Sequence, residues 1–153
     1  MKDNVSHDSV LYEQTALDYF LQHIFPGRDY FYQMAYYKPV VHPGQFHFRR
    51  SDLMGDLPEE AYTIDRSVKI PDLSGVRLQV VAPPGVKITE HHEGIEDNTY
   101  FLYLEVYTRM PLKNGHCMVG IELNGYRFFN SFFIEIDPKD NKVVKWFFNG
   151  INF

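Results

Sequence analysis

The sequence lacks most of the features that would assign the chain to a class outright. Its only cysteine, Cys117, cannot form a disulfide within the chain, which is typical of a reducing compartment. No stretch approaches the roughly 18–20 consecutive apolar residues of a membrane helix. The N-terminus is polar and carries Asp3 and Asp8 ahead of any apolar run, unlike a secretory signal. We therefore expect a cytoplasmic protein that does not associate with membranes.

Positive charge and glycine-rich motifs are also scarce. The chain has 15 Lys and Arg against 20 Asp and Glu, for a net charge of -5 at pH 7. Such a chain does not attract a phosphate backbone over a broad surface, so we expect no nucleic-acid partner. The glycine-rich loops that hold nucleotide phosphates are absent, and so is the Gly-x-Ser-x-Gly turn of serine hydrolases. We expect no cofactor and no nucleophilic serine.

Aromatic residues, by contrast, are abundant. They make up 16% of the 153 residues, with 13 Phe, 11 Tyr and a single Trp. Aromatic side chains favour strands and bury large areas. The length suits one domain, and no linker or repeat divides it, so we expect residues 1–153 to form a single β-rich domain.

One amphipathic helix is predicted over residues 9–25. Leu17, Phe20 and Ile24 recur at helical spacing with Val10 and Leu21 on one face, while Glu13, Gln14, Asp18 and Gln22 fall largely on the other. Asp8 or Ser9 is predicted to cap its start, and Pro26-Gly27 to end it.

The last third of the chain predicts an antiparallel meander of four strands, at about 100–112, 116–123, 126–137 and 142–149. Asn-Gly pairs favour two-residue hairpin turns. Turns at 114–115 and 124–125 pair Met110 with Val119 and Ile121 with Phe128, and a third turn sets Ile136 opposite Val144. The apolar residues then share one face, which the helix should cover. They are Leu102, Leu104, Val106, Met110, Cys117, Val119, Ile121, Leu123, Phe128, Phe132, Ile134, Ile136, Val144, Trp146 and Phe148.

The predicted fold class is therefore α+β, an N-terminal helix packed on a curved antiparallel sheet. Strands are also expected at about 30–37, 46–50, 76–82 and 86–92, in an order that the sequence leaves open. The outline resembles cystatin-like and NTF2-like domains, whose sheets curl around a helix. Neither group's motifs are present, so this analogy concerns the outline alone and implies no function.

The opposite face of the meander is unusually aromatic for a surface that meets water, and it forms our main candidate site. The predicted register places Tyr107, Glu122 and Arg127 in one cross-strand row and Arg109, Gly120 and Phe129 in the next, with Tyr103 nearby. An apolar surface with a few charges is typical of a ligand pocket or a protein interface. Among aromatic rings, the pKa of Glu122 or Glu105 would be raised, as acid–base chemistry requires.

A second cluster is a candidate metal site. Glu90, His91, His92 and Glu93 carry imidazole and carboxylate groups, which bind zinc and similar ions. Alternation along a strand lets at most two of them converge, so His42, His47 or His116 would have to join them.

These features predict a non-enzymatic binding or protein-interaction domain that uses the aromatic face. A protein partner or self-association is the favoured occupant, and a small-molecule ligand is the alternative. A small enzyme is the second hypothesis, using either the His and Glu cluster or a carboxylate acid or base in a sheet cavity. The third is a structural domain whose own early strands cover both faces of the sheet.

Overall fold

The computed structural model describes residues 10–27, 34–45, 62–73, 75–90, 102–125 and 128–152. An α-helix, α1 (Tyr12–Tyr19), continues into a π-helical turn, η2 (Phe20–Ile24), and a 3-10 turn, η3 (Phe25–Gly27). The strands are β1 (Met34–Tyr37), β2 (His42–Gln45), β3 (Lys87–Thr89), β4 (Leu102–Thr108), β5 (Met110–Pro111), β6 (Cys117–Gly125), β7 (Phe128–Asp137) and β8 (Lys142–Asn152). Within the described ranges, no helix is long and apolar enough to cross a membrane.

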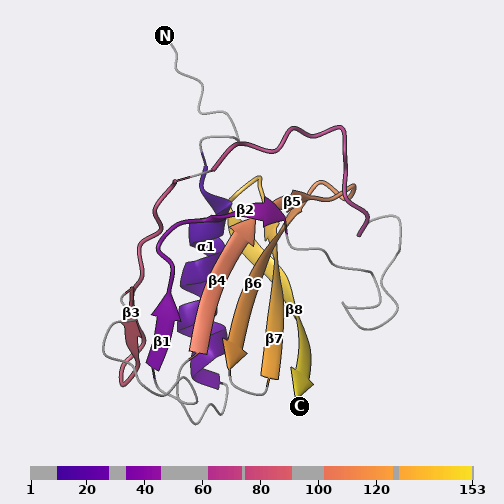
Figure 1. Ribbon diagram of the computed structural model, residues 1–153. Helices are drawn as coiled ribbons and strands as arrows, with labels where there is room; N and C mark the ends of the chain where they lie inside the picture. The colour runs from indigo at the N-terminus through magenta and orange to yellow at the C-terminus, as the bar shows by residue number, and fades with distance from the viewer. Residues whose placement is uncertain are drawn as a thin grey trace.

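The strands form one sheet in the order β3-β1-β4-β6-β7-β8, with α1 packed behind it (Figure 1). Strands β4, β6, β7 and β8 pair antiparallel as the predicted C-terminal meander. The early strands, whose order the sequence left open, add in parallel: β1 pairs with β4 and β3, and β2 pairs with β4. The predicted α+β class, one helix on a sheet that ends in a meander, is confirmed.

The helix buries the predicted apolar face but begins later than predicted. Leu17, Phe20 and Ile24 are buried with Leu21, and the ring of Phe20 lies 4.9 Å from that of Phe132 in the sheet. The helix starts at Tyr12, and its N-cap residue is Leu11, which makes no side-chain capping hydrogen bond. The prediction of a start at residue 9 was therefore wrong, and the proposed caps Asp8 and Ser9 lie outside the described residues.

The first hairpin turn has three residues rather than the predicted two. The Leu112 N–H donates to the His116 carbonyl at 2.8 Å, and the Gly115 N–H donates to the Leu112 carbonyl at 3.0 Å. Gly115 has φ +90°, the left-handed conformation that glycine adopts without a Cβ penalty. Met110 therefore pairs with Met118 and not with Val119.

A bulge at Arg109 then changes which face the following residues occupy. Val106 pairs with Ile121 while Met110 pairs with Met118, so the β4–β5 side carries one extra residue. Arg109 consequently points to the helix side, where it contacts Glu13. The predictions that Arg109 lies on the outer face and Met110 on the helix face were both wrong, because the sequence pattern assumed unbroken alternation.

The second reversal also differs, but without changing the faces. Gly125 pairs with Phe128, so Ile121 lies opposite Phe132 instead of Phe128. This slip is even, and side chains alternate with a period of two, so each residue keeps its face. Ile121 and Phe132 are both fully buried, as the shared apolar face requires.

The register of β7 with β8 is confirmed over most of its length. Ile134 pairs with Trp146, but an irregularity follows, and Ile136 pairs with Val143 instead of Val144. Val144 is 49% exposed. Its predicted place in the core was wrong, because the bulge next to the turn moves Val143 onto the helix side in its stead.

The two faces of the sheet have separate cores. The larger lies between the sheet and the helix. The smaller lies on the outer face, where Met118 and Phe133 are buried under Tyr62 and Ile64. The chain's own residues thus cover one end of the outer face. The hypothesis of a purely structural domain expects the chain to cover this whole face.

Candidate functional site

The other end of the outer face carries a polar group of side chains that we call the outer-face cluster: Lys38, His42, Glu105, Tyr107, Glu122 and Asn124. Its centre is a pair of carboxylates. Glu105 on β4 and Glu122 on β6 are directly opposed across the two strands, and both are half-buried. Directly opposed residues of an antiparallel pair have Cβ atoms about 4.5–5.5 Å apart, so like charges there destabilise the sheet.

Basic side chains from the early part of the chain lie beside Glu105. Lys38 Nζ lies 3.5 Å from its carboxylate and His42 Nε2 lies 3.8 Å away. The parallel pairing of β2 with β4 places His42 opposite Tyr107, with ring centroids 4.3 Å apart. Thr108 fixes this strand by donating to the His42 carbonyl at 2.8 Å.

The negative charge of Glu122 has fewer compensating contacts than that of Glu105. The Asn124 amide donates a hydrogen bond to its carboxylate, but in the described part of the chain no cation lies within ion-pair distance of it. Burial, and secondarily the charge of Glu105, raises the pKa of Glu122 above its usual value. The Asn124 Oδ1 atom is itself buried, and no described residue donates to it.

Tyr107 completes the cluster as a neutral phenol. Burial, and then the charges of Glu122 and Glu105, raises its pKa above the ordinary tyrosine value. The hydroxyl therefore stays protonated at neutral pH. The cluster offers two carboxylates that accept hydrogen bonds beside a neutral aromatic ring. Chemically, this arrangement favours a ligand that carries a positive charge and several N–H donors.

The structure brings together only part of the predicted site. Tyr103 pairs with Asn124, which pairs with Phe129 across β6 and β7, so these residues form a row next to the carboxylates. Phe129 is 46% exposed. Gly120 is buried opposite Phe133 under the covered end, away from Phe129, so the predicted row of Arg109, Gly120 and Phe129 was wrong.

The predicted row of Tyr107, Glu122 and Arg127 was also wrong. Glu122 lies opposite Glu105 on one side and Ser131 on the other, and Arg127 is outside the described residues. The sequence pattern found Glu105 on this face but missed Lys38, His42 and Asn124. The first two reach the cluster through parallel pairing of early strands, for which a single sequence carries no register signal.

The predicted metal cluster lies mostly outside the described residues, which include Glu90 but not His91, His92 or Glu93. Glu90 Oε1 accepts a hydrogen bond from Arg77 Nη2 at 3.0 Å. Among the residues whose placement is described, no group of three or more His, Cys, Asp or Glu side chains could hold a metal ion.

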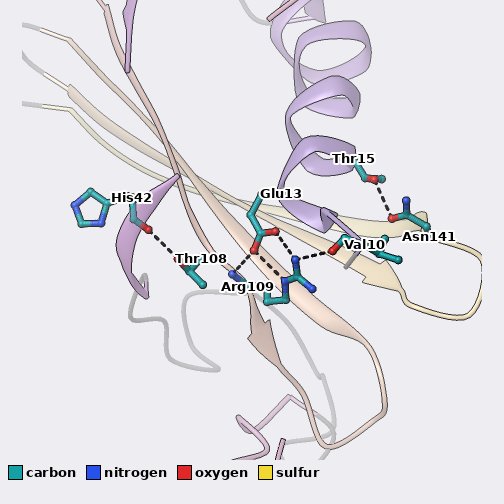
Figure 2. Close-up of polar contacts among 7 residues, drawn as sticks. All are labelled: Val10, Glu13, Thr15, His42, Thr108, Arg109 and Asn141. Atoms are coloured by element: carbon teal, nitrogen blue, oxygen red, sulfur yellow. Dashed lines mark hydrogen bonds and ion pairs between the residues drawn. The ribbon is translucent and has the colours of Figure 1, made fainter. Parts of the chain in front are cut away.

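Arg109, removed from the outer face by the bulge, forms a buried ion pair with Glu13 of α1 (Figure 2). Its Nε and Nη2 donate to the two carboxylate oxygens at 3.1 and 2.8 Å, and its backbone N–H donates at 2.7 Å. Nη2 also donates to the Val10 carbonyl at 2.8 Å, and the guanidinium carbon lies 4.4 Å from the ring centroid of Tyr12. Glu13, predicted on the exposed side of the helix, is in fact fully buried.

A third polar network surrounds Glu135, which is buried near the first hairpin turn. Its carboxylate accepts hydrogen bonds from the Tyr62 hydroxyl at 2.7 Å and the Asn114 amide at 3.3 Å, and it lies 2.5 Å from His116 Nδ1. His116 Nε2 is 3.8 Å from Asp137. This imidazole borders a cavity of about 260 Å³ that Cys117 also lines. Burial raises the pKa of the Cys117 thiol to about 12, which makes it unreactive.

No family model matches this sequence, and no curated protein or solved structure is significantly similar to it. Function must therefore be inferred from the chain's own residues.

Proposed function

We propose that this protein is a non-enzymatic binding domain whose outer-face cluster captures a cationic side chain of a protein partner. The observation that carries the proposal is the direct opposition of Glu105 and Glu122, both half-buried, with Glu122 lacking an ion pair among the described residues. A guanidinium or ammonium group between the two carboxylates would remove their repulsion and form charge-assisted hydrogen bonds.

The energetic argument is that the arrangement is unfavourable in the free domain. Opposed like charges weaken a strand pair by about 0.2–1 kcal/mol. No described residue donates to the buried Asn124 oxygen, which adds a second unfavourable contribution because a buried acceptor has lost its water contacts. Sites that carry such groups at the expense of stability are often binding sites.

The surroundings of the carboxylates fit a protein interface. Tyr103 and Tyr107 are half-buried, and Phe129 is 46% exposed in the row beside them. Aromatic rings are enriched at interfaces, where they supply apolar contact area and attract cations over their faces. A Lys- or Arg-bearing segment would meet both kinds of group here, and the chain's net charge of -5 would favour its approach.

The test is a titration of the ¹⁵N-labelled protein with tetra-arginine peptide, followed by amide chemical shifts. We expect saturable shifts concentrated at residues 103–107 and 122–124, and none with tetra-glutamate. Glu122→Gln should weaken peptide binding several-fold. Asp140→Asn, an equal charge change in the exposed β7–β8 turn, should leave it within experimental error. Shifts spread evenly over all acidic residues, or equal losses in the two variants, would contradict the proposal.

An enzyme that uses Glu122 as a general acid is the second candidate, and the raised pKa of Glu122 favours it. The two functions differ in the protonation state that they need. A carboxylate that binds a cation must be ionised, so peptide affinity should rise with pH through the pKa of Glu122 and then stay constant. A general acid is active only while protonated, so its activity would fall over the same interval.

A further inference from the structure

We infer that β8 is the contact surface of a homodimer, in which the β8 strands of two copies pair antiparallel and join the two sheets into one. β8 lies at one end of the strand order, and no described strand pairs with the side of β8 that faces away from β7 (Figure 1). The N–H and C=O groups on such an edge can form hydrogen bonds with a strand of another chain. This surface is separate from the outer-face cluster, whose two carboxylates lie on β4 and β6.

The two edges of the sheet differ in how much backbone they present. β3, at the opposite edge, has 3 residues, and such a short strand offers little for another chain to pair with. β8 has 11 residues. None of residues 142–150 is buried, whereas residues 132–136 of the neighbouring β7 are all buried. These exposures leave β8 accessible to another molecule.

The apolar part of this edge is centred on Trp146, the chain's only tryptophan. Trp146 pairs with Ile134 on the helix side of the sheet, and its ring centroid lies 6.3 Å from that of Phe132. It is nevertheless 36% exposed, and Val144 nearby is 49% exposed. Tryptophan is enriched among the residues that contribute most to binding at interfaces. A second copy on this edge would remove the exposed part of the indole from water.

The distribution of charge along β8 favours a second copy as the occupant. Lys142 and Lys145 lie in the first half of the strand, and residues 146–152 carry no charge. In an antiparallel pair, the first half of one strand meets the second half of the other, so the lysines do not face one another. A parallel pair would set each lysine beside its own copy, which is unfavourable. β8 is therefore complementary to itself in the antiparallel direction.

The side chains favour the register centred on Phe147. Around this centre, Trp146 lies opposite Phe148 of the second copy, and Lys145 lies opposite Asn149 of the second copy. Aromatic pairs directly across two strands stabilise a sheet. The two-fold axis of this dimer is perpendicular to the sheet, so both helices stay on the same side and both aromatic pairs lie on that side.

The neighbouring registers are less favourable. A centre at Phe148 would set Trp146 opposite Gly150, which has no side chain to pack against the indole. A centre at Trp146 would set Phe148 opposite Val144, where the bulge interrupts the alternation of side chains. A shift that pairs odd with even positions would set residues of opposite faces against each other.

Sedimentation velocity and the fluorescence of Trp146 test the inference together. The protein is examined from about 5 to about 500 µM, because small interfaces are commonly weak. We expect the mass to rise from monomer to dimer, and the emission maximum to move to shorter wavelength over the same concentrations. A monomer throughout, an assembly larger than a dimer, or a dimer whose Trp146 emission equals that of the monomer would overturn the inference.

Two substitutions at Asn149 test the direction and register of the pairing. Asn149→Lys sets a lysine opposite Lys145 of the second copy and should weaken dimerisation about 2- to 30-fold, because each dimer contains this contact twice. Asn149→Glu sets a carboxylate there and should strengthen dimerisation. A variant that fails to fold cannot dimerise more tightly, so Asn149→Glu keeps the test independent of folding.

The matched control is the same pair of substitutions at Val81, which is 69% exposed and belongs to the segment beside β3. There the changes act only through the net charge of -5, which Lys reduces and Glu increases in magnitude. Val81→Glu should therefore dimerise no more tightly than Val81→Lys, the reverse of the order expected at Asn149. The same order at both positions would overturn the inference.

Discussion

Two pairs of charged residues in this molecule show opposite solutions to the same problem. Glu13 and Arg109 are buried between α1 and the sheet with opposite charges and several mutual hydrogen bonds (Figure 2). Glu105 and Glu122 are half-buried on the other face with the same charge. The first pair is internally neutral and has its hydrogen bonds satisfied. Among the described residues, Lys38 and His42 lie within ion-pair distance of the second pair, both at Glu105.

The comparison suggests a structural role for Glu13 and Arg109 and a binding role for Glu105 and Glu122. A paired buried charge becomes costly when one member is removed, because the other stays buried alone. An opposed pair of like charges becomes less costly when one member is neutralised. Mutations of the two pairs should therefore change stability in opposite directions.

The largest effect is expected at the helix-side pair. Arg109→Met leaves Glu13 buried with the backbone N–H of residue 109 as its one donor among the described residues, and should lower the free energy of unfolding by about 3–5 kcal/mol. Urea unfolding followed by circular dichroism measures this. The double variant Glu13→Leu/Arg109→Met should recover most of the loss. A loss of less than 1 kcal/mol in the single variant would show that the pair is not a closed structural unit.

A smaller loss of stability is expected when the network around Glu135 is disrupted. Glu135, like Glu13, is a buried carboxylate surrounded by hydrogen-bond donors. Tyr62→Phe removes the hydrogen bond of 2.7 Å while keeping the ring that packs against Phe147. It should lower the free energy of unfolding by about 1.5 kcal/mol, the value of a hydrogen bond to a charged group. A neutral or stabilising result would mean that Glu135 resembles the outer-face carboxylates and not Glu13.

The smallest change, and one of opposite sign, is expected at Glu122. Glu122→Gln removes the repulsion with Glu105 and should raise the free energy of unfolding at pH 7 by about 0.2–1 kcal/mol. Asp140→Asn is the matched control and should have no comparable effect. Destabilisation by Glu122→Gln would show that this carboxylate contributes to the fold.

The stability difference between Glu122→Gln and the unmodified protein should depend on pH, because the pKa of Glu122 is raised in the folded state. The folded state binds a proton at Glu122 more tightly than the unfolded chain, in which the pKa is near 4.5. The contribution of Glu122 to stability is thus fully present below the unfolded value and is lost as pH rises through the folded value. The advantage of Glu122→Gln should disappear at pH values below about 4, as equilibrium unfolding at several pH values would show.

Alternation of apolar residues predicted the helix, the four meander strands and the division of residues between two faces. It succeeded because a wrong register that slips by two or four residues still keeps each side chain on its face, as at Ile121 and Phe132. It failed wherever one residue is added to a strand. The bulges at Arg109 and Val144 carry no pattern of their own, and each reversed the prediction for the residues beside it.

The candidate site was predictable to the same extent. Glu105, Tyr107 and Glu122 followed from alternation along strands that the turns had already placed. Lys38 and His42 did not, because parallel pairing joins segments far apart in the chain without a turn that fixes their register. The buried pair of Glu13 and Arg109 was missed for a related reason: a helical pattern assigns charged residues to the solvent side, and only the bulge supplies the partner that Glu13 needs.

The most direct test of the central claim is the pKa of the Glu122 carboxyl group, measured by NMR with and without tetra-arginine peptide. If the outer-face cluster is a cation-binding site, this pKa lies above 4.5 in the free protein and falls when the peptide saturates it. A pKa at or below 4.5 in the free protein, or one that the bound peptide leaves unchanged, would contradict the account.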